Sequence, residues 1–160
     1  VERSRGLGDE YKRQYKNCEI NYNKEGKPTL NNGFQLSISH SKGFVALLIH
    51  PTATVGIDIQ VSKPNINKAT QLFMSKKELT DLGECKTEQK LDKLHIYWCA
   101  KEALYKYASN STFSLDKDFT ISPFKLQKKG VIKGHIRNTE HETELFYLVE
   151  PNYYCVYTKS

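Results

Sequence analysis

The sequence has 160 residues, and its 38% apolar and 11% aromatic residues suffice for one compact domain with a hydrophobic core. Its 24 basic and 18 acidic side chains give a formal charge of +6, which suits a partner that carries phosphates or an acidic surface. No apolar run approaches the roughly 18 residues of a membrane span, so we expect no membrane insertion and a cytoplasmic protein.

The cysteines and the start of the chain also bear on its compartment. Neither a CxxC pair nor the Cys/His spacing of a zinc site occurs among the four cysteines, which are Cys18, Cys85, Cys99 and Cys155. We therefore expect four reduced thiols. The polar start does not resemble a signal peptide. Because the only methionine is Met74, we expect the natural start of translation to lie upstream of Val1.

The first third of the chain predicts short strands separated by turns. Residues 9–16 are compatible with one or two helical turns, whereas the Gly, Asn and Pro residues at 25–28 and 31–33 are typical of tight turns. Residues 34–39 alternate apolar and polar, which predicts a half-buried strand. The continuous apolar run at 44–49 predicts a strand covered on both faces, and the two strands should form a hairpin.

Side-chain alternation assigns faces to the strands. In the first of them we expect Phe34, Leu36 and Ile38 to point inward and Ser39 to lie on the other face. Residues 55–60 alternate again, so one face of this strand carries Gly56, Asp58 and Gln60. An acid and an amide therefore project side by side, next to a position without a side chain.

The remainder predicts helices followed by strands. A short helix is expected over 65–73, a capping box at 75–78 opens another, and the strongest helix runs from Thr87 to about Ala108 because it contains no Pro or Gly. Strands joined by short connections follow at 119–124, 131–136, 145–149 and 153–157. The overall prediction is an α+β fold in which a long helix packs on an antiparallel sheet.

The long helix carries an acid in an unexpected place. On a helical wheel, Glu102 falls inside the apolar arc formed by Leu91, Leu94, Trp98 and Tyr105. A buried carboxylate needs a cation, hydrogen-bond donors or a metal. Lys106, one turn further on, lines the same edge. The alternative is that Glu102 and Lys106 form only an ion pair at the rim of the helix.

Asp58 supplies a second acid from a different element. An aspartate in a Val/Ile strand is uncommon unless it caps a turn or binds a ligand, and both interpretations stay open for Asp58 alone. Two carboxylates that meet form a hard-oxygen site of the kind that binds Mg²⁺ together with water and substrate phosphates.

These residues resemble a known signature. Residues 56–59 (Gly-Ile-Asp-Ile), followed by 98–103 (Trp-Cys-Ala-Lys-Glu-Ala) and Lys106, look like the paired motifs of the 4′-phosphopantetheinyl transferase superfamily. Residues 26–28 (Gly-Lys-Pro) and 38–41 (Ile-Ser-His-Ser) resemble two further motifs of its surfactin-synthetase-activating (Sfp-like) branch. The resemblance spans residues 26 to 106 in the expected order.

The resemblance implies a fold and a reaction. Such enzymes use Mg²⁺ to move the phosphopantetheine arm of coenzyme A onto a serine of an acyl or peptidyl carrier protein, releasing 3′,5′-ADP. By similarity Asp58 and Glu102 would hold Mg²⁺, Glu102 would also act as general base, and Lys106 would stabilise the leaving group. Lys27, Ser39, His40 and, more weakly, Lys101 would contact the nucleotide end of coenzyme A.

Two departures from the family pattern leave alternatives open. The Sfp-like enzymes commonly have a third acid where this chain has Gln60, whose amide could still ligate Mg²⁺. They also have two similar lobes, so we expect residues 1–50 to be the end of an incomplete first lobe and 51–160 a complete second lobe, together one compact unit. A non-catalytic protein that binds coenzyme A or a nucleotide is the alternative function. A basic nucleic-acid-binding domain has only net charge and scattered Tyr in its favour, and we expect no nucleic-acid partner.

Overall fold

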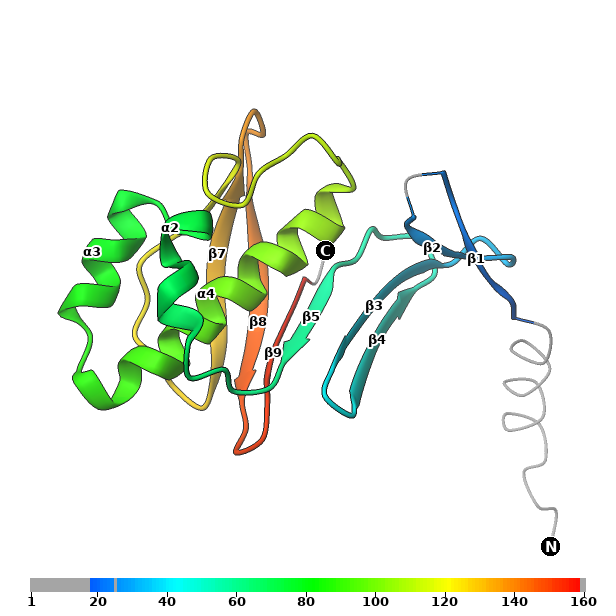
Figure 1. Ribbon diagram of the computed structural model, residues 1–160. Helices are drawn as coiled ribbons and strands as arrows, with labels where there is room; N and C mark the ends of the chain where they lie inside the picture. Colours follow the sequence, from blue (N-terminus) through cyan, green and yellow to red (C-terminus); the bar gives the residue numbers. More distant parts are fainter. Residues whose placement is uncertain (1–17, 25, 159–160) are drawn as a thin grey trace, which may run out of the picture.

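A five-stranded antiparallel sheet and one long helix form the centre of the structure (Figure 1). The computed structural model describes residues 18–24 and 26–158, so the helical turns expected over 9–16 lie outside the described residues. Its strands are β1 (Ile20–Tyr22), β2 (Pro28–Leu30), β3 (Gln35–Ser41), β4 (Phe44–His50), β5 (Ile57–Gln60), β6 (Phe119–Ile121), β7 (Lys129–Ile136), β8 (Glu142–Val149) and β9 (Tyr154–Thr158). Its helices are η1 (Ile66–Ala69), α2 (Thr70–Phe73), α3 (Lys76–Glu84) and α4 (Thr87–Ala108).

The sheet joins a strand from the middle of the chain to four strands from its C-terminal part. Its order is β5-β9-β8-β7-β6, so the antiparallel meander predicted for the last four strands is confirmed. Strand β5 pairs with β9 at one edge, where Asp58 lies opposite Val156. The strand that carries the first acid is thereby fixed to the C-terminal strand of the sheet.

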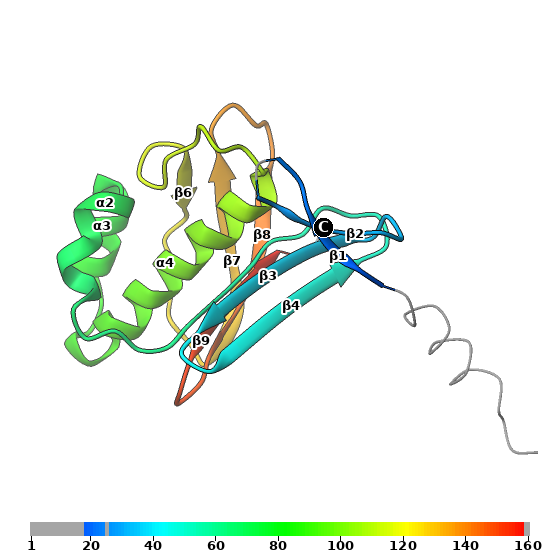
Figure 2. The same ribbon diagram turned by 45° about the vertical axis from the view of Figure 1, so that its right-hand side comes forward.

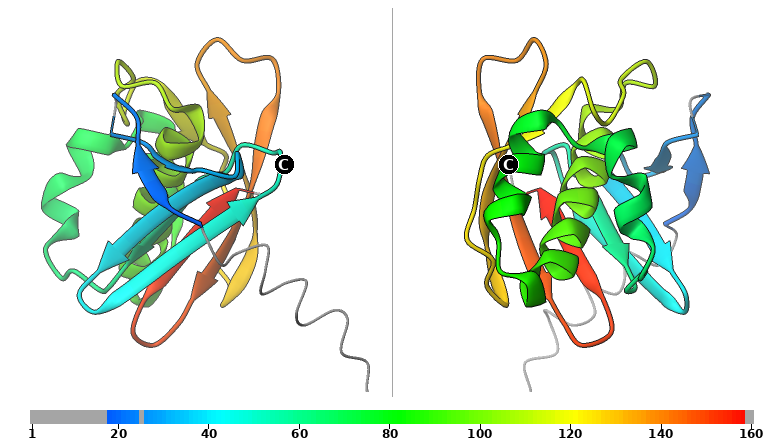
Figure 3. Two further views of the ribbon diagram at one scale, coloured as in Figure 1. Left: turned by 90° about the vertical axis from the view of Figure 1, so that its right-hand side faces the viewer. Right: turned by 60° about the vertical axis from the view of Figure 1, so that its left-hand side comes forward.

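Helix α4 has the predicted bounds and crosses one face of the sheet (Figure 1; right-hand view of Figure 3). Its last residue is Ala108, and Ser109 caps it in the left-handed conformation, with a φ of 53°. The predicted apolar arc is wrong in part: Leu91 is exposed, Trp98 is half-buried, and the fully buried positions include Ile96 and Leu104. Two faces of α4 pack against other elements. A helical wheel with one apolar arc therefore does not identify the buried residues of this helix correctly.

The capping box predicted for α3 is confirmed, and it is tied to α4 by a buried ion pair. Ser75 caps the helix, and its backbone N–H donates to Glu78 Oε2 at 2.6 Å. The other carboxylate oxygen accepts from the Ile121 N–H at 2.7 Å. Lys101 Nζ lies 2.8 Å from Glu78, and neither side chain is exposed. This cluster joins α3, α4 and β6.

Strands β3 and β4 form the predicted hairpin, with a two-residue turn at Lys42 and Gly43 (Figure 2). The expectation that residues 44–49 are covered on both faces is wrong. Only the face with Phe44, Ala46 and Leu48 packs, against the side of β5 and β9 that is not covered by α4. Exposed side chains on the opposite face of β4 are Val45, Leu47 and Ile49.

The serine face of β3 also differs from expectation. Leu36 is buried as predicted and Ile38 is half-buried, but Ser37, Ser39 and Ser41 are buried as well. These three hydroxyls face the free edge of β5. In the left-hand view of Figure 3 the hairpin lies in front of the sheet.

Two further expectations concern the chain as a whole. In the part of the chain that the structure describes, no helix is long and apolar enough to cross a membrane, and no two of the four cysteines form a disulfide. Residue 50 is the last residue of β4, and the division of the chain into two lobes at that point stays a prediction.

Candidate active site

Asp58 is a buried acid surrounded by hydrogen-bond donors. Its side chain is 4% exposed. Oδ1 accepts from the Ser39 hydroxyl at 2.7 Å and from Lys106 Nζ at 2.9 Å. The Cys99 thiol lies against the same carboxylate. Burial is the main cause that raises the pKa of this thiol, and the charge of Asp58 raises it further. Residues from a hairpin strand, a sheet strand and the long helix therefore meet at one carboxylate.

The contact between β5 and α4 depends on Gly56. A Cβ at this position would lie 2.0 Å from the Ala103 carbonyl oxygen and 2.9 Å from the Tyr107 nitrogen. Glycine allows the strand to touch the helix backbone. At this contact Lys106 Nζ also donates to the Ile57 carbonyl at 2.9 Å. The strand acid is therefore held directly against the helix.

Glu102 lies on the same side of α4 as Lys106, four residues away. Burial raises the pKa of its carboxyl, and the negative charge of Asp58 raises it further, whereas Lys106 and Lys63 lower it. The two acids are thus close enough to interact electrostatically, and their shared role in binding a metal stays a prediction. Their mutual repulsion would be relieved by a cation or a proton between them.

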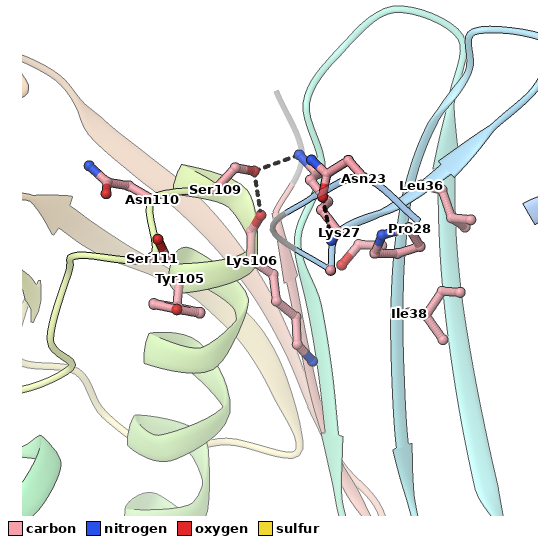
Figure 4. A pocket seen from close by; sticks show the side chains of 12 residues that line it. Asn23, Lys27, Pro28, Leu36, Ile38, Tyr105, Lys106, Ser109, Asn110 and Ser111 are labelled. Atoms are coloured by element: carbon pink, nitrogen blue, oxygen red, sulfur yellow. Dashed lines mark hydrogen bonds between the residues drawn. The ribbon is translucent and has the colours of Figure 1, made fainter. Parts of the chain in front are cut away.

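A first hollow opens beside Lys106, between the end of α4 and strands β2 and β3 (Figure 4). It has a volume of about 250 Å³, and its lining includes Lys27, Pro28 and Tyr105. Lys27 Nζ donates to the Ser109 hydroxyl at 2.5 Å, and burial lowers the pKa of its ammonium group. Two lysines in one hollow suit a ligand that carries several phosphates.

A second hollow, of about 430 Å³, begins at Gln60. Its lining combines two lysines, Lys42 and Lys63, with the apolar side chains of Ile66, Ala69 and Trp98. Trp98 packs edge-on against Phe73 with ring centroids 5.0 Å apart.

The two hollows flank the acids. Asp58 contacts Lys106, which lines the first hollow, and Gln60, which lines the second. One lysine from each hollow, Lys106 from the first and Lys63 from the second, lowers the pKa of Glu102. Asp58 therefore contacts one lining residue of each hollow.

The structure does not bring all the sequence-predicted residues to the acids. Lys101 Nζ contacts Glu78 and donates to the Leu115 carbonyl at 3.0 Å, so its ammonium belongs to the buried α3–α4 cluster. His40 is exposed and follows Ser39 on β3, so the two side chains point to opposite faces of the strand. A contact between His40 and a nucleotide stays a prediction.

Gln60 presents its nitrogen to the strand acid. Nε2 lies 3.5 Å from Asp58 Oδ2, and Oε1 accepts from the Ser41 hydroxyl at 3.4 Å. To offer an oxygen to a metal beside Asp58, the amide would have to turn over. Metal ligation by Gln60 stays a prediction.

Sequence reasoning missed three residues of this region: Lys63, Cys99 and Ser109. Lys63 and Ser109 lie just outside regular elements, where side-chain periodicity gives no direction. Cys99 was visible, since it stands three residues before Glu102 and therefore on the same helix face. Its spacing of three residues from Glu102 was the signal that could have identified it.

The donor set fits a magnesium ion with few protein ligands. Within residues 18–24 and 26–158 there is no group of three or more His, Cys, Asp or Glu side chains that could hold a metal. Asp58 and Glu102 supply two carboxylates, and Mg²⁺ is commonly bound through one or two carboxylates plus substrate phosphates. Their electrostatic repulsion is the observation that favours a cation at this place.

The comparison with protein families decides the assignment. The family model described as the 4′-phosphopantetheinyl transferase superfamily matches residues 54–158, which include β5, α4 and the whole five-stranded sheet. The chain belongs to the 4′-phosphopantetheinyl transferase superfamily. The resemblance seen in residues 56–59 and 98–106 is thereby confirmed at the level of the superfamily.

Curated relatives agree with this assignment. The chain is 31% identical over 101 residues to the 4′-phosphopantetheinyl transferase AcpT of Salmonella typhimurium (strain LT2), covering 61% of this chain and 53% of the relative. It is also 31% identical over 102 residues to AcpT of Escherichia coli (strain K12), covering 61% and 52% respectively. The chain spans about half the length of these relatives.

Proposed function

We propose that this protein transfers the 4′-phosphopantetheine arm of coenzyme A to a serine of an acyl or peptidyl carrier protein, with Mg²⁺, and releases 3′,5′-ADP. The observation that carries this proposal is the Asp58–Lys106 ion pair beside the first hollow, with Glu102 near enough for both charges to shift its pKa. Membership of the superfamily and the similarity to the AcpT proteins support it.

The two hollows suit the two halves of coenzyme A. The first contains Lys27 and Lys106, whose ammonium groups suit the phosphates of the nucleotide half. The second also contains two lysines, Lys42 and Lys63, but adds the apolar side chains of Ile66 and Trp98, which suit the uncharged pantetheine arm. The bond to be broken, a phosphorus–oxygen bond of the diphosphate bridge, would then lie beside the acids.

The residues between the hollows have distinct roles in the proposed reaction. Glu102, whose pKa is raised, accepts the proton of the carrier serine hydroxyl. The serine oxygen forms a bond to phosphorus as the phosphorus–oxygen bond to 3′,5′-ADP breaks. Lys106 stabilises the negative charge on the departing phosphate. Asp58 holds Lys106 in place before substrate enters.

Mg²⁺ would be held by Asp58 and Glu102, with the Gln60 amide as a further candidate ligand. When bound, it supplies positive charge that neutralises and polarises the diphosphate. On this proposal the ammonium of Lys106, which now contacts Asp58, becomes available to the substrate phosphates.

The remaining nucleotide contacts follow the resemblance only in part. We keep Lys27, because it lines the first hollow, and we leave Lys101 out, because its ammonium pairs with Glu78. The motifs at 26–28 and 38–41 favour the Sfp-like branch, with residues 1–50 as the end of its first lobe. The positive net charge suits docking to an acidic carrier protein.

A direct test is to incubate the protein with coenzyme A, Mg²⁺ and apo carrier proteins of both the acyl and the peptidyl type. Mass spectrometry should show the mass of the phosphopantetheine arm on a carrier, and the gain should disappear when EDTA is added. No gain with any carrier would contradict the proposal.

One observation favours a second candidate function, a coenzyme A-binding protein without transfer. A neutral amide, Gln60, stands beside Asp58 where many relatives of the Sfp-like branch have a third acid. Calorimetry that shows coenzyme A binding, together with no transfer to any carrier, would select this alternative. Transfer that is accelerated by Gln60→Glu would favour the enzyme.

A further inference from the structure

Three alternate residues of β3 satisfy the free edge of β5 through their side chains. The Ser37 hydroxyl accepts from the Ile57 N–H at 3.0 Å. Ser39 accepts from the Ile59 N–H at 3.2 Å, and Ser41 accepts from the Val61 N–H at 3.1 Å. An edge strand usually leaves such groups unpaired or pairs them with another strand. Here hydroxyl groups replace the carbonyls of a neighbouring strand.

The middle hydroxyl differs from the other two because it also contacts the strand acid. Ser39 Oγ donates to Asp58 Oδ1 at 2.7 Å while it accepts from the Ile59 N–H. A hydroxyl has one proton to donate. That proton is already engaged with Asp58, and the side chain is buried, so Ser39 has no donor left for a phosphate.

We infer that Ser39 is a positioning residue for Asp58 and that it does not contact the nucleotide. Its oxygen is fixed by the backbone of β5, and its proton fixes one carboxylate oxygen of Asp58. The other oxygen, Oδ2, lies 3.5 Å from Gln60 Nε2, and Gln60 lines the second hollow. The inference rests on the proposed function, because it assigns Asp58 to the metal that the reaction would use.

The test compares Ser39→Ala with Ser37→Ala. Each variant removes one hydroxyl that accepts from a β5 N–H, but only Ser39→Ala also removes a contact with Asp58. We expect similar losses of thermal stability from both. Mn²⁺, used as a spectroscopic probe in place of Mg²⁺, should bind Ser39→Ala about tenfold more weakly by EPR titration, since loss of an outer hydrogen bond typically costs 10–100-fold in metal affinity.

Two further measurements separate positioning from simple destabilisation. Ser37→Ala should bind Mn²⁺ within about twofold of wild type, and Ser39→Thr, which keeps the hydroxyl, should recover most of the affinity lost in Ser39→Ala. Equal Mn²⁺ affinity in Ser39→Ala and Ser37→Ala would overturn the inference.

Substrate analogues separate the two possible roles of Ser39. If Ser39 acts through Asp58, the ratio of wild-type to Ser39→Ala activity is the same with coenzyme A and with 3′-dephospho-coenzyme A. If the ratio falls to one with the dephospho compound, Ser39 binds the 3′-phosphate and the inference is wrong. Wild-type protein that binds Mn²⁺ but transfers nothing overturns the proposed function alone. Wild-type protein that binds no Mn²⁺ overturns both.

Discussion

Two of the three ion pairs that helix α4 makes with other described residues have nearly equal lengths but lie in different surroundings. Lys101 and Glu78 lie 2.8 Å apart with no side-chain exposure, and Lys106 and Asp58 lie 2.9 Å apart with 27% and 4% exposure. We call them the sealed pair and the open pair. The open pair borders the first hollow through Lys106, and Asp58 raises the pKa of a second acid, Glu102. Lys101 of the sealed pair also interacts with a second acid, Asp116, but neither partner of that pair reaches the surface. Burial of an ion pair therefore does not by itself indicate a catalytic or metal site, whereas a further acid beside a partly exposed pair does.

The largest effect is expected at the acid of the open pair. Asp58→Asn removes the charge that binds Lys106 and the proposed metal, so transfer activity should fall by about 10³-fold. Activity should be measured with saturating coenzyme A and a range of Mg²⁺ concentrations. Asp118→Asn is the matched control, since Asp118 is buried and pairs with Arg137 at 2.8 Å. A comparable loss of activity in this control would mean that removal of any buried acid suffices.

The sealed pair should affect stability and leave the chemistry intact. Lys101→Met leaves Glu78 charged and buried, which should lower the free energy of unfolding by about 3 kcal/mol or more. Combining it with Glu78→Gln should recover part of this loss in urea unfolding, because the uncompensated charge is gone. The KM for coenzyme A should stay within about twofold of wild type. A much larger KM would restore the sequence-based prediction that Lys101 binds the nucleotide.

The second acid of the open pair should separate stability from activity. Because burial and Asp58 raise the pKa of Glu102, the stability that its neutral form contributes is present at acid pH and lost as pH rises through the raised value. Glu102→Gln should therefore raise the thermal midpoint of the metal-free protein at pH 8, while activity falls about 10²-fold. A lower midpoint would show that the ionised carboxylate is already compensated without metal.

The smallest effect concerns a buried neutral group on the same helix. His95 stacks on Tyr154 and its Nε2 accepts from the Lys63 N–H at 2.9 Å. Burial lowers its pKa, although the Leu91 carbonyl and Asp92 oppose this effect. Stability should thus be complete above about pH 6.5 and fall as pH decreases towards the lowered value, by up to about 1.4 kcal/mol per pH unit. Urea unfolding of His95→Gln should show a flatter dependence between pH 5 and 6.5.

How far the sequence predicts this molecule depends on the range of the interactions involved. The bounds of α4 were predictable because they depend on local propensity and on the absence of Gly and Pro between Thr87 and Ala108. The pairing of β5 with β9 was not, because the partners lie about a hundred residues apart and nothing local specifies it. The exposed face of β4 was also missed, since a continuous apolar run looks the same whether one face of a strand or both are covered.

The candidate site divides in the same way. Asp58, Glu102 and Lys106 could be selected from a motif resemblance and from the cost of placing a carboxylate in an apolar surface. The sealed pair could not be separated from them, because Lys101 and Glu102 are neighbours in the same motif and only the packing of α3 shows which one turns into the core. Ser39 likewise belongs to a motif, but its partners are visible only once β3 lies against β5.

The position of Gly56 places an unusual constraint on the coding sequence. Every amino acid other than glycine carries a Cβ, and a Cβ at position 56 would lie 2.0 Å from the Ala103 carbonyl oxygen. A missense change at this codon would therefore push the strand away from the helix, and with it one acid from the other. Mutation of a residue that touches no substrate would then inactivate the protein as surely as loss of a charged group, and both acids would still be present.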